Sequence, residues 1–368
     1  MKRTFCLILS LIICFPLSLK AKATSAKACI VICGDTGQTI YGENEDFRMP
    51  MASTTKIMTG LLLCEYGDLD REIVTTKEMV TVEGSSMGLL EGDRVSLKTL
   101  LYGLLLASGN DAANTIAIIV GGSVRNFVAM MNDRAIDMGL SDTHFETPSG
   151  LDGDTHFTTC RDLATLAMEA MKNETFRQVV ATESISVSYG NPPYNRRITN
   201  HNRLLKTYDD VVGVKTGFTK KSGRCLVSAA KKDGKYVIAV TLNDPNDWQD
   251  HRVLLDRGLN GTELVNIKPN DEEINIPVIN GIKDNISVKI EPLEICAKKD
   301  SKTECKVYIK PNIIAPIEEE ELLGGAEYFV DGNKVAQKEI KADKNIPQSK
   351  IKKWDIYLNI FEFMILHI

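Results

Sequence analysis

The segment from Ile57 to Leu63 is an apolar run that follows directly on Ser53-Thr54-Thr55-Lys56. Such a run predicts a buried helix that begins near Ser53, and the rest of the fold has to cover it. Because residues three apart share a helix face, Lys56 can direct its amine at the Ser53 hydroxyl. Burial or a neighbouring positive charge lets a lysine lose its proton and act as the base that a serine nucleophile needs. This turn of helix therefore predicts a nucleophile, its base and, through backbone N–H groups, part of an oxyanion site.

The same Ser-x-x-Lys pattern occurs at Ser228–Lys231 and at Ser349–Lys352. The first lies in an alternating, strand-like run before a hairpin-turn signal, so its serine and lysine would not share a helix face. The second lies in a lysine-rich segment with nothing around it to bury the amine. We interpret both as structural.

The N-terminus has the order of an export signal, which we place at residues 1–23. Lys2 and Arg3 precede an apolar segment from Phe5 to Leu19, and an Ala-Lys-Ala ending at Ala23 follows. The apolar segment is short for a membrane span, so cleavage after Ala23 is predicted, with an uncleaved anchor as the alternative. Cleavage would remove four basic side chains and take the formal charge from −5 to −9. Such an acidic chain argues against nucleic acid as a partner.

Nine cysteines are present, two of them in the predicted export signal, and the other seven are expected mainly as buried thiols. Cys29 and Cys33 would stand about 13 Å apart in one strand, too far for a disulfide. A turn at Asp300 would let Cys296 and Cys305 face each other, which leaves a cross-strand disulfide as the alternative. Without a Cys-x-x-Cys or His-Glu-x-x-His pattern, we expect neither a metal site nor a cofactor.

The order of elements predicts two domains. The first, residues 24–262, opens with a hairpin of two strands, Ala28–Cys33 and Gln38–Tyr41. The predicted helices after the one at Ser53 are Leu97–Ala107 with Ser96 as its N-cap, Asp111–Val120, Val124–Met138 and Arg161–Met171. Strands then return at Val211–Lys215, Cys225–Ala230 and Tyr236–Leu242, followed by a helix near Trp248–Arg257. Strands at both ends with helices between them predict an α+β fold, an antiparallel sheet packed against a helical cluster.

Short alternating runs characterise the second predicted domain, residues 263–345. Examples are Ile286–Ile290 and Cys305–Ile309, and few helical periods appear between them. This pattern predicts a small all-β domain, which we expect to be a β-sandwich.

The last predicted segment, residues 346–368, is an amphipathic helix. It begins with lysines and continues as an apolar stretch from Trp354 to Leu366, in which Asp355, Asn359 and Glu362 recur at helical spacing. The helix is too short and too polar to span a bilayer, and its lysines and aromatic residues suit the membrane interface. A helix docked on the protein's own surface is the alternative.

Two further motifs accompany Ser53–Lys56. Ser108-Gly109-Asn110 falls in a turn between two apolar helices, where helix capping would also explain it. Lys215-Thr216-Gly217 ends a predicted strand, and Gly223 begins the next. Lys-Thr-Gly is expected by chance in roughly one chain of this size in ten, so the ordered set of three motifs is a specific signal.

In this order the motifs resemble those of the serine penicillin-recognising enzymes. The chain looks most like the low-molecular-mass penicillin-binding proteins that act as D-alanyl-D-alanine carboxypeptidases. The segments that carry this resemblance are Pro50–Thr59, Leu106–Ala113, Thr147–Leu151 and Gly213–Thr219. The resemblance covers nearly the whole mature chain. It implies a penicillin-binding/β-lactamase-like transpeptidase domain, a trailing β domain, and a C-terminal anchor on the outer face of the cytoplasmic membrane.

The resemblance also implies roles in catalysis. Ser53 would attack the carbonyl between the two terminal D-alanines of a peptidoglycan stem peptide and form an acyl-enzyme, and β-lactam antibiotics would acylate the same serine. Lys56 would take the Ser53 proton and later activate the hydrolytic water. Ser108 would relay a proton to the leaving amine.

The resemblance also implies residues that bind the substrate around the catalytic ones. Asn110 would hold the amide backbone of the substrate, and Lys215 and Thr216, next to Gly217, would bind its free carboxylate. The backbone N–H groups of Ser53 and Phe218 would form the oxyanion hole. Lys215 is expected to lower the pKa of Lys56 by like-charge repulsion.

Other readings remain open at this level. A second cation for the carboxylate would be His201 or Arg203, although each is equally well explained as a surface residue, and His156 is interpreted as structural. A class A β-lactamase needs a glutamate that activates water, and Glu146 lies in that region without the surrounding pattern. Gly109 also stands where those enzymes carry an aspartate. A DD-endopeptidase with the same residues and a catalytically silent wall-binding protein are the remaining alternatives.

Overall fold

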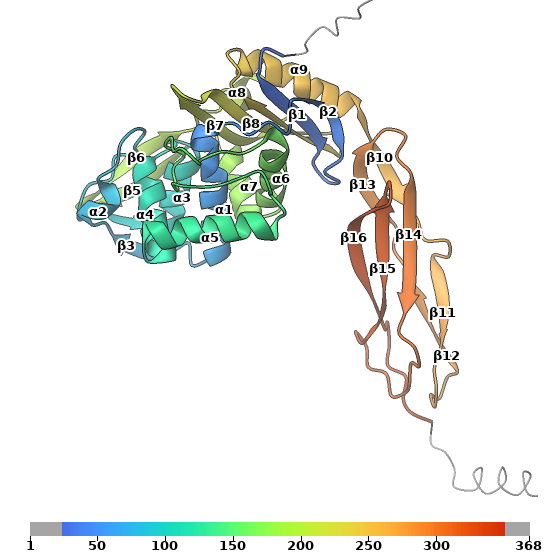
Figure 1. Cartoon of the computed structure of the whole chain (residues 1–368). Helices are drawn as coiled ribbons and strands as arrows, with labels where there is room; N and C mark the ends of the chain where they lie inside the picture. Colours follow the sequence, from blue (N-terminus) through green and yellow to red (C-terminus); the bar gives the residue numbers. More distant parts are fainter. Residues whose placement is uncertain (1–23, 350–368) are drawn as a thin grey trace, which may run out of the picture.

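The computed structural model describes residues 24–349 of the chain (Figure 1). The predicted export signal and residues 350–368 of the predicted C-terminal helix lie outside the described residues. The described part consists of a mixed α/β domain followed by an all-β domain, as the sequence predicts (Figure 1).

A five-stranded antiparallel sheet forms the centre of the α/β domain, with strand order β2-β1-β9-β8-β7. Its strands are β1 (Ala28–Cys33), β2 (Thr39–Glu43), β7 (Val211–Thr219), β8 (Gly223–Lys232) and β9 (Lys235–Leu242). The first hairpin joins the last three strands because β1 pairs with β9, with Ile30 opposite Val240. Alternate residues of β1 are buried on both faces: Ile30 belongs to the main core and Val31 to a smaller core under α9. The predicted sheet is therefore confirmed.

Helices cover both faces of this sheet. The helices are α1 (Lys56–Tyr66), α2 (Lys77–Val80), α3 (Leu97–Leu105), α4 (Asn110–Gly121), α5 (Val124–Asp137), α6 (Cys160–Ala170), α7 (Glu174–Ala181), α8 (Leu204–Thr207) and α9 (Asp247–Asn260). Helix α1 is buried from Lys56 to Leu63, which confirms the predicted central helix. The helix begins later than predicted, because a 3-10 turn, η1 (Ala52–Thr55), carries Ser53. Ser96 caps α3 as expected, accepting a bond from the Thr99 N–H at 3.1 Å.

A second sheet in this domain was not predicted. It consists of β3 (Glu72–Val74), β4 (Arg94–Ser96), β5 (Ser184–Gly190) and β6 (Pro193–Thr199). Strands β3 and β4 are too short for their periodicity to be recognised. Strand β5 does alternate, with Ile185, Val187 and Tyr189 separated by serines, so the sequence contained a usable signal for the β5–β6 hairpin.

The all-β domain has its own hydrophobic core, in which Leu323 and Tyr328 are fully buried. Its strands are β10 (Thr262–Ile267), β11 (Glu273–Pro277), β12 (Asn285–Lys289), β13 (Leu293–Lys298), β14 (Thr303–Ile309), β15 (Leu322–Val330) and β16 (Asn333–Lys341). They pair as β10-β13, β11-β12 and β14-β15-β16.

The alternative of a disulfide between Cys296 and Cys305 is wrong for this structure. Cys296 on β13 lies opposite Leu264 of β10, whereas Cys305 on β14 lies opposite Tyr328 of β15. The two strands pair with other partners rather than with each other, so the two thiols do not face one another and both are free.

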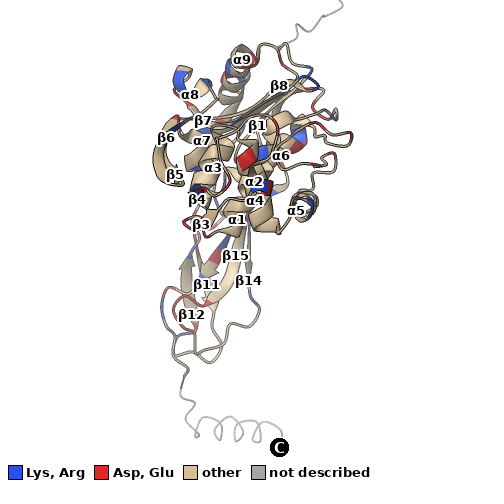
Figure 2. Ribbon diagram, turned by 90° about the vertical axis from the view of Figure 1, so that its left-hand side faces the viewer, with Lys and Arg blue, Asp and Glu red and all other residues tan. Residues whose placement is uncertain are grey.

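The all-β domain extends away from the α/β domain, with β11 and β12 at its far end in both views (Figures 1 and 2). The described chain ends there, where the Ser349 N–H donates to the Asn280 carbonyl at 2.7 Å. Ile346 is buried in the β-domain core and exchanges backbone hydrogen bonds with Ile317. Residues 346–349 therefore belong to the β domain, and the predicted helix does not begin at residue 346.

Within residues 24–349, no single helix is both long and apolar enough to cross a bilayer. Only α4 and α5 taken together, with a bend of 84° between them, reach that length and composition.

Candidate active site

The amine of Lys56 is the most completely bonded group of the site. Lys56 is fully buried at the start of α1, and its Nζ lies 2.9 Å from Ser53 Oγ, 2.7 Å from Asn110 Oδ1 and 2.6 Å from the Ser149 carbonyl. An ammonium has three N–H donors, and this arrangement supplies one partner for each. The predicted Ser53–Lys56 contact is present even though Ser53 lies in the 3-10 turn.

The pKa of Lys56 lies well below its ordinary value. Burial is the largest cause, the positive charge of Lys215 is the second, and the Asp111 carboxylate acts in the opposite direction. The expected effect of Lys215 is thus present, but burial outweighs it. A buried amine that lacks a close carboxylate loses its proton readily, which suits a general base.

Lys215 and Ser108 form a second pair on the other side of the cleft. Lys215 is buried, and its Nζ lies 3.1 Å from Ser108 Oγ and 2.9 Å from the Thr216 carbonyl. Burial lowers the pKa of Lys215 to about 7. Ser108 has a φ of +60° between α3 and α4, a conformation that costs a non-glycine residue energy and is found preferentially at functional sites.

Asn110 lies beneath the cleft rather than at its surface. Its Nδ2 donates to the Glu83 carbonyl at 2.6 Å, and its backbone N–H donates to the Ser85 carbonyl at 2.7 Å. The donor to Glu83 fixes which side-chain atom is the oxygen, so Oδ1 is the atom that faces Lys56.

Asp111 fixes a loop beside the cleft that sequence reasoning missed. Its carboxylate accepts hydrogen bonds from Ser86 Oγ at 2.6 Å and from the backbone N–H groups of Met87, Gly88 and Leu89 at 2.9–3.0 Å. These bonds hold the loop against the N-terminus of α4. The acidic residue directly after Ser108-Gly109-Asn110 was the available signal.

Strand β7 passes so close to η1 that a side chain at residue 217 would crowd the Ser53 turn. A Cβ at Gly217 would lie 3.0 Å from the Ser53 backbone nitrogen and 3.1 Å from that of Thr54. Lys215, Thr216 and Gly217 lie inside β7, not at its end as predicted, because β7 pairs with β8 as far as Thr219. Phe218 follows at the mouth of the cleft with 65% of its side chain exposed.

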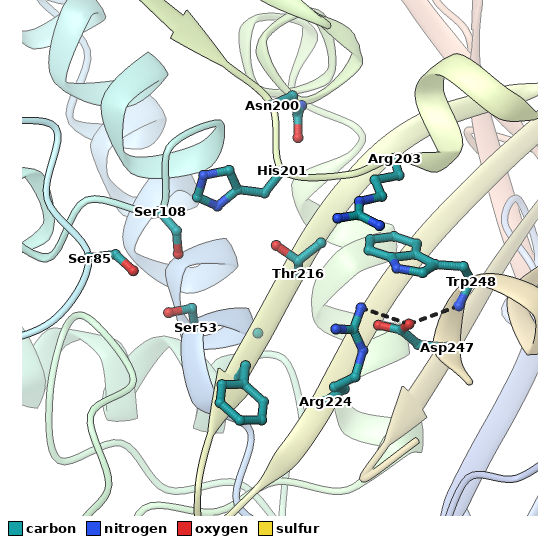
Figure 3. A pocket seen from close by; sticks show the side chains of 12 residues that line it. Ser53, Ser85, Ser108, Asn200, His201, Arg203, Thr216, Arg224, Asp247 and Trp248 are labelled. Carbon is teal, nitrogen blue, oxygen red and sulfur yellow. Dashed lines mark hydrogen bonds and ion pairs between the residues drawn. The ribbon is translucent and has the colours of Figure 1, made fainter. Parts of the chain in front are cut away.

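A cleft of about 520 Å³ runs past these residues. Ser53, Ser108 and Thr216 point into one end of it, and His201 lies above them (Figure 3). Arg203, Arg224 and Trp248 gather at the other end (Figure 3).

The two candidates for a second cation differ in charge. Burial is the largest cause of the lowered pKa of His201, and Lys215 is the second, so the imidazole is neutral at pH 7. Arg203 keeps its charge, as guanidinium groups do. Arg224 is held in an ion pair with Asp247, at 2.9 Å, and was missed by sequence reasoning because it lies nine residues beyond Lys215 on the next strand.

His156 and Glu146 lie behind the Ser53 turn. His156 Nε2 lies 2.8 Å from Thr55 Oγ1, and its Nδ1 accepts from the Glu146 N–H at 3.0 Å. The Glu146 side chain accepts from Thr155 Oγ1 at 2.5 Å and is not among the groups that line the cleft. The glutamate that a class A β-lactamase would need is therefore not supplied by Glu146.

The antiparallel sheet, the helical cluster and a serine paired with a buried lysine define a serine hydrolase of the penicillin-recognising class. Residues 17–246 match the profile of a family described as D-alanyl-D-alanine carboxypeptidase (peptidase S11). Residues 263–348 match that of the penicillin-binding protein 5 C-terminal domain. The chain belongs to the D-alanyl-D-alanine carboxypeptidase family.

Individual relatives agree with this family. The D-alanyl-D-alanine carboxypeptidase DacF of Bacillus subtilis is 32% identical over 89% of this chain and 87% of its own length. The structure of the carboxypeptidase DacD from Francisella tularensis is 25% identical with a TM-score of 0.64, covering 89% of this chain and 96% of that one. The Streptomyces K15 DD-transpeptidase structure is 33% identical with a TM-score of 0.62, covering 64% of this chain and 98% of that one.

Proposed function

We propose that the chain removes the terminal D-alanine from peptidoglycan pentapeptide stems through an acyl-enzyme on Ser53, and that β-lactams acylate the same serine. The observation that carries this proposal is the set of three partners around Lys56 Nζ.

A neutral Lys56 has two N–H groups and one lone pair. Asn110 Oδ1 and the Ser149 carbonyl can only accept hydrogen bonds, so they take the two N–H groups. The lone pair is then left for the third partner, the Ser53 hydroxyl, which donates its proton to it. In this state Lys56 is oriented as the general base for acylation, and after acylation the same lone pair can activate water.

The free carboxylate of the substrate is assigned to the part of the cleft between Thr216 and Arg203. Protonated Lys215, the Thr216 hydroxyl and Arg203 would bind it, and Arg203 is preferred to His201 because His201 is neutral. Ser108, bonded to Lys215, would pass a proton to the leaving D-alanine. Asn110 would support the substrate backbone indirectly, by fixing Lys56 and the Glu83–Ser85 loop.

The oxyanion hole is assigned to the backbone N–H groups of Ser53 and Phe218. The close approach that Gly217 permits brings β7 alongside η1, where the two groups would converge on the carbonyl oxygen of the scissile bond.

The proposed organisation assigns residues 1–23 to an export signal, 24–262 to the catalytic domain and 263–345 to a β-sandwich domain. The C-terminal segment is assigned to a helix that lies on the outer face of the cytoplasmic membrane. The position of Ser349 at the far end of the β domain supports this, because the anchor would then attach at the end remote from the α/β domain (Figure 1).

The test is to incubate the chain, without its predicted export signal, with a peptide that ends in D-Ala-D-Ala and to follow free D-alanine. Release of one D-alanine per peptide together with a long-lived penicillin adduct is expected, and Ser53→Ala should lose both. Rapid penicillin turnover without D-alanine release would make the chain a β-lactamase. Cleavage of a crosslinked peptide dimer in preference to the linear peptide would make it a DD-endopeptidase.

A further inference from the structure

Two buried thiols meet where the two domains join. Cys33 ends β1 in the α/β domain, and Cys296 lies in β13 of the β domain, 263 residues further along the chain. Cys33 Sγ donates to the Cys296 carbonyl at 3.0 Å, and Cys296 Sγ lies 3.8 Å from the Tyr236 carbonyl, which also accepts the Gly34 N–H at 2.8 Å. The Cys296 N–H donates to the Asp35 carboxylate at 3.0 Å, which holds the two segments together.

We propose that Cys33 and Cys296 form a reversible disulfide that links the α/β domain to the β domain. The bond needs two thiols on segments that are held close together, and the contacts of Cys33 Sγ and Asp35 with the Cys296 backbone hold them so.

A cavity lies next to the pair. It measures about 750 Å³ and is lined by Gly34 and Asp35, which follow Cys33, and by Glu294 and Ile295, which precede Cys296. Neither cysteine lines this cavity and both are fully buried, so an oxidant that enters it reaches the thiols only when the segments between them open locally.

The oxidation step is thiol–disulfide exchange with that small-molecule disulfide. The Cys33 thiolate attacks one sulfur of the oxidant and expels the other as a thiolate, which gives a mixed disulfide. Cys296 then loses its proton and displaces the remaining part of the oxidant. Two protein thiols lose two protons and two electrons, and the oxidant is reduced to two thiols.

The ionisation of the pair fits this order of attack. The neighbouring Cys296 side chain is the largest cause of the lowered pKa of Cys33, which is about 7. The Cys33 side chain is in turn the largest cause of the raised pKa of Cys296. Cys33 is therefore the thiol that supplies a thiolate at neutral pH.

Neither cysteine lines the cleft that contains Ser53. The disulfide would change how firmly the β domain is held, while the hydrolytic site would be unaffected. An exported protein meets the oxidising conditions in which such a bond persists.

The test uses the full-length chain, purified in reduced form and incubated with glutathione disulfide. After unfolding and alkylation of the remaining thiols, non-reducing digestion and mass spectrometry should find a peptide containing Cys33 joined to one containing Cys296, and dithiothreitol should separate them. Cys33→Ser should abolish the joined peptide, whereas Cys29→Ser, another buried cysteine of β1, should retain it. Recovery of Cys33 and Cys296 as separately alkylated or glutathionylated residues would overturn the proposal.

A second measurement gives the physical consequence. The oxidised chain should melt roughly 5 °C or more above the reduced chain, because the bond closes a very long loop. Its rate of acylation by penicillin should be unchanged. An equal melting temperature in an oxidised sample that contains the joined peptide would show that the bond does not fasten the domains.

Discussion

At the scale of single residues, the chemistry of the site depends on the three hydrogen-bond partners of Lys56 Nζ. In the neutral state proposed for Lys56, Asn110 Oδ1 and the Ser149 carbonyl would accept its two N–H groups, and the Ser53 hydroxyl would donate to its lone pair. A lowered pKa alone would leave the amine unprotonated without orienting its lone pair. The two oxygen acceptors would supply that orientation.

Replacement of Lys56 by alanine should slow acylation of Ser53 by a fluorescent penicillin about 10²–10⁴-fold, the usual contribution of a general base. Stopped-flow labelling measures this rate. The matched control is Lys231→Ala, which alters the strand-borne Ser-x-x-Lys, and it should label at the wild-type rate. Wild-type labelling by the Lys56 variant would remove the lysine from the mechanism.

The second prediction concerns Lys215, whose pKa is lowered to about 7 by burial. Its charge is present below this pH and is lost as the pH rises, so binding of a free carboxylate should weaken. The value of kcat/KM for a peptide acid should fall roughly fivefold between pH 7 and 8. The corresponding peptide amide lacks the carboxylate and should not show this fall. An equal fall for both substrates would assign the ionisation to another group.

At the scale of elements, one buried histidine bonds helix α9 to two strands of the central sheet. His251 is fully buried, its Nδ1 is hydrogen-bonded to the Ser228 hydroxyl on β8, and its Nε2 lies 3.0 Å from Thr241 Oγ1 on β9. Burial lowers its pKa to about 3. Burial therefore disfavours the protonated imidazole in this position.

The third prediction follows from this shift. His251 ionises near pH 6.5 when unfolded and near 3 when folded, so the folded state loses stability as the pH falls through this window. The loss from this group should reach about 3 kcal/mol by pH 4.5. Urea unfolding at pH 7 and 4.5 should show a smaller acid loss for His251→Gln than for the wild type. His144→Gln, at an exposed position, should match the wild type.

His156 adds a loss of the same sign, since burial lowers its pKa to about 4. The difference in acid-induced loss of stability between the wild type and His251→Gln measures the contribution of His251 alone. An acid loss in His251→Gln as large as that of the wild type would contradict the assignment.

Elements and motifs were predictable to different degrees. The buried run after Lys56 and the apolar runs of β1, β8 and β9 between turn signals made their type predictable, whereas the pairing of β1 with β9 follows only from the fold. The 3-10 turn at Ser53 could not, because its four residues contain no period, and tertiary contacts with β7 determine it. Arg224, Asp247 and the loop held by Asp111 come together only through the fold.

At the scale of the whole molecule, the chemistry is confined to one domain. The residues that line the cleft all lie between Ser53 and Trp248, before the β domain begins. The Streptomyces K15 structure matches 64% of this chain over 98% of its own length. It is therefore a folded relative that is about as long as the α/β domain.

The fourth prediction is that residues 24–262 alone are acylated by penicillin at a rate close to that of residues 24–349. The β domain contributes no group to the cleft, so its removal should lower stability more than reactivity. Labelling rate and melting temperature measured on both chains test this, with Ser53→Ala in the shorter chain as the blank. A folded short chain that fails to label would show that the β domain shapes the site.

The α/β domain, whose residues line the cleft, and the last described residue lie at opposite ends of the molecule (Figure 1). If the chain is held at a membrane surface by its C-terminal end, the reactive serine stays at a nearly fixed distance from that surface. It then reaches only the substrate in a thin layer at that distance. Substrate supply then depends on how many stem peptides cross that layer per unit area, not on their concentration in the wall. The length of the β domain would determine the distance from the membrane at which stem peptides lose their terminal D-alanine. The residues around the serine would not need to change.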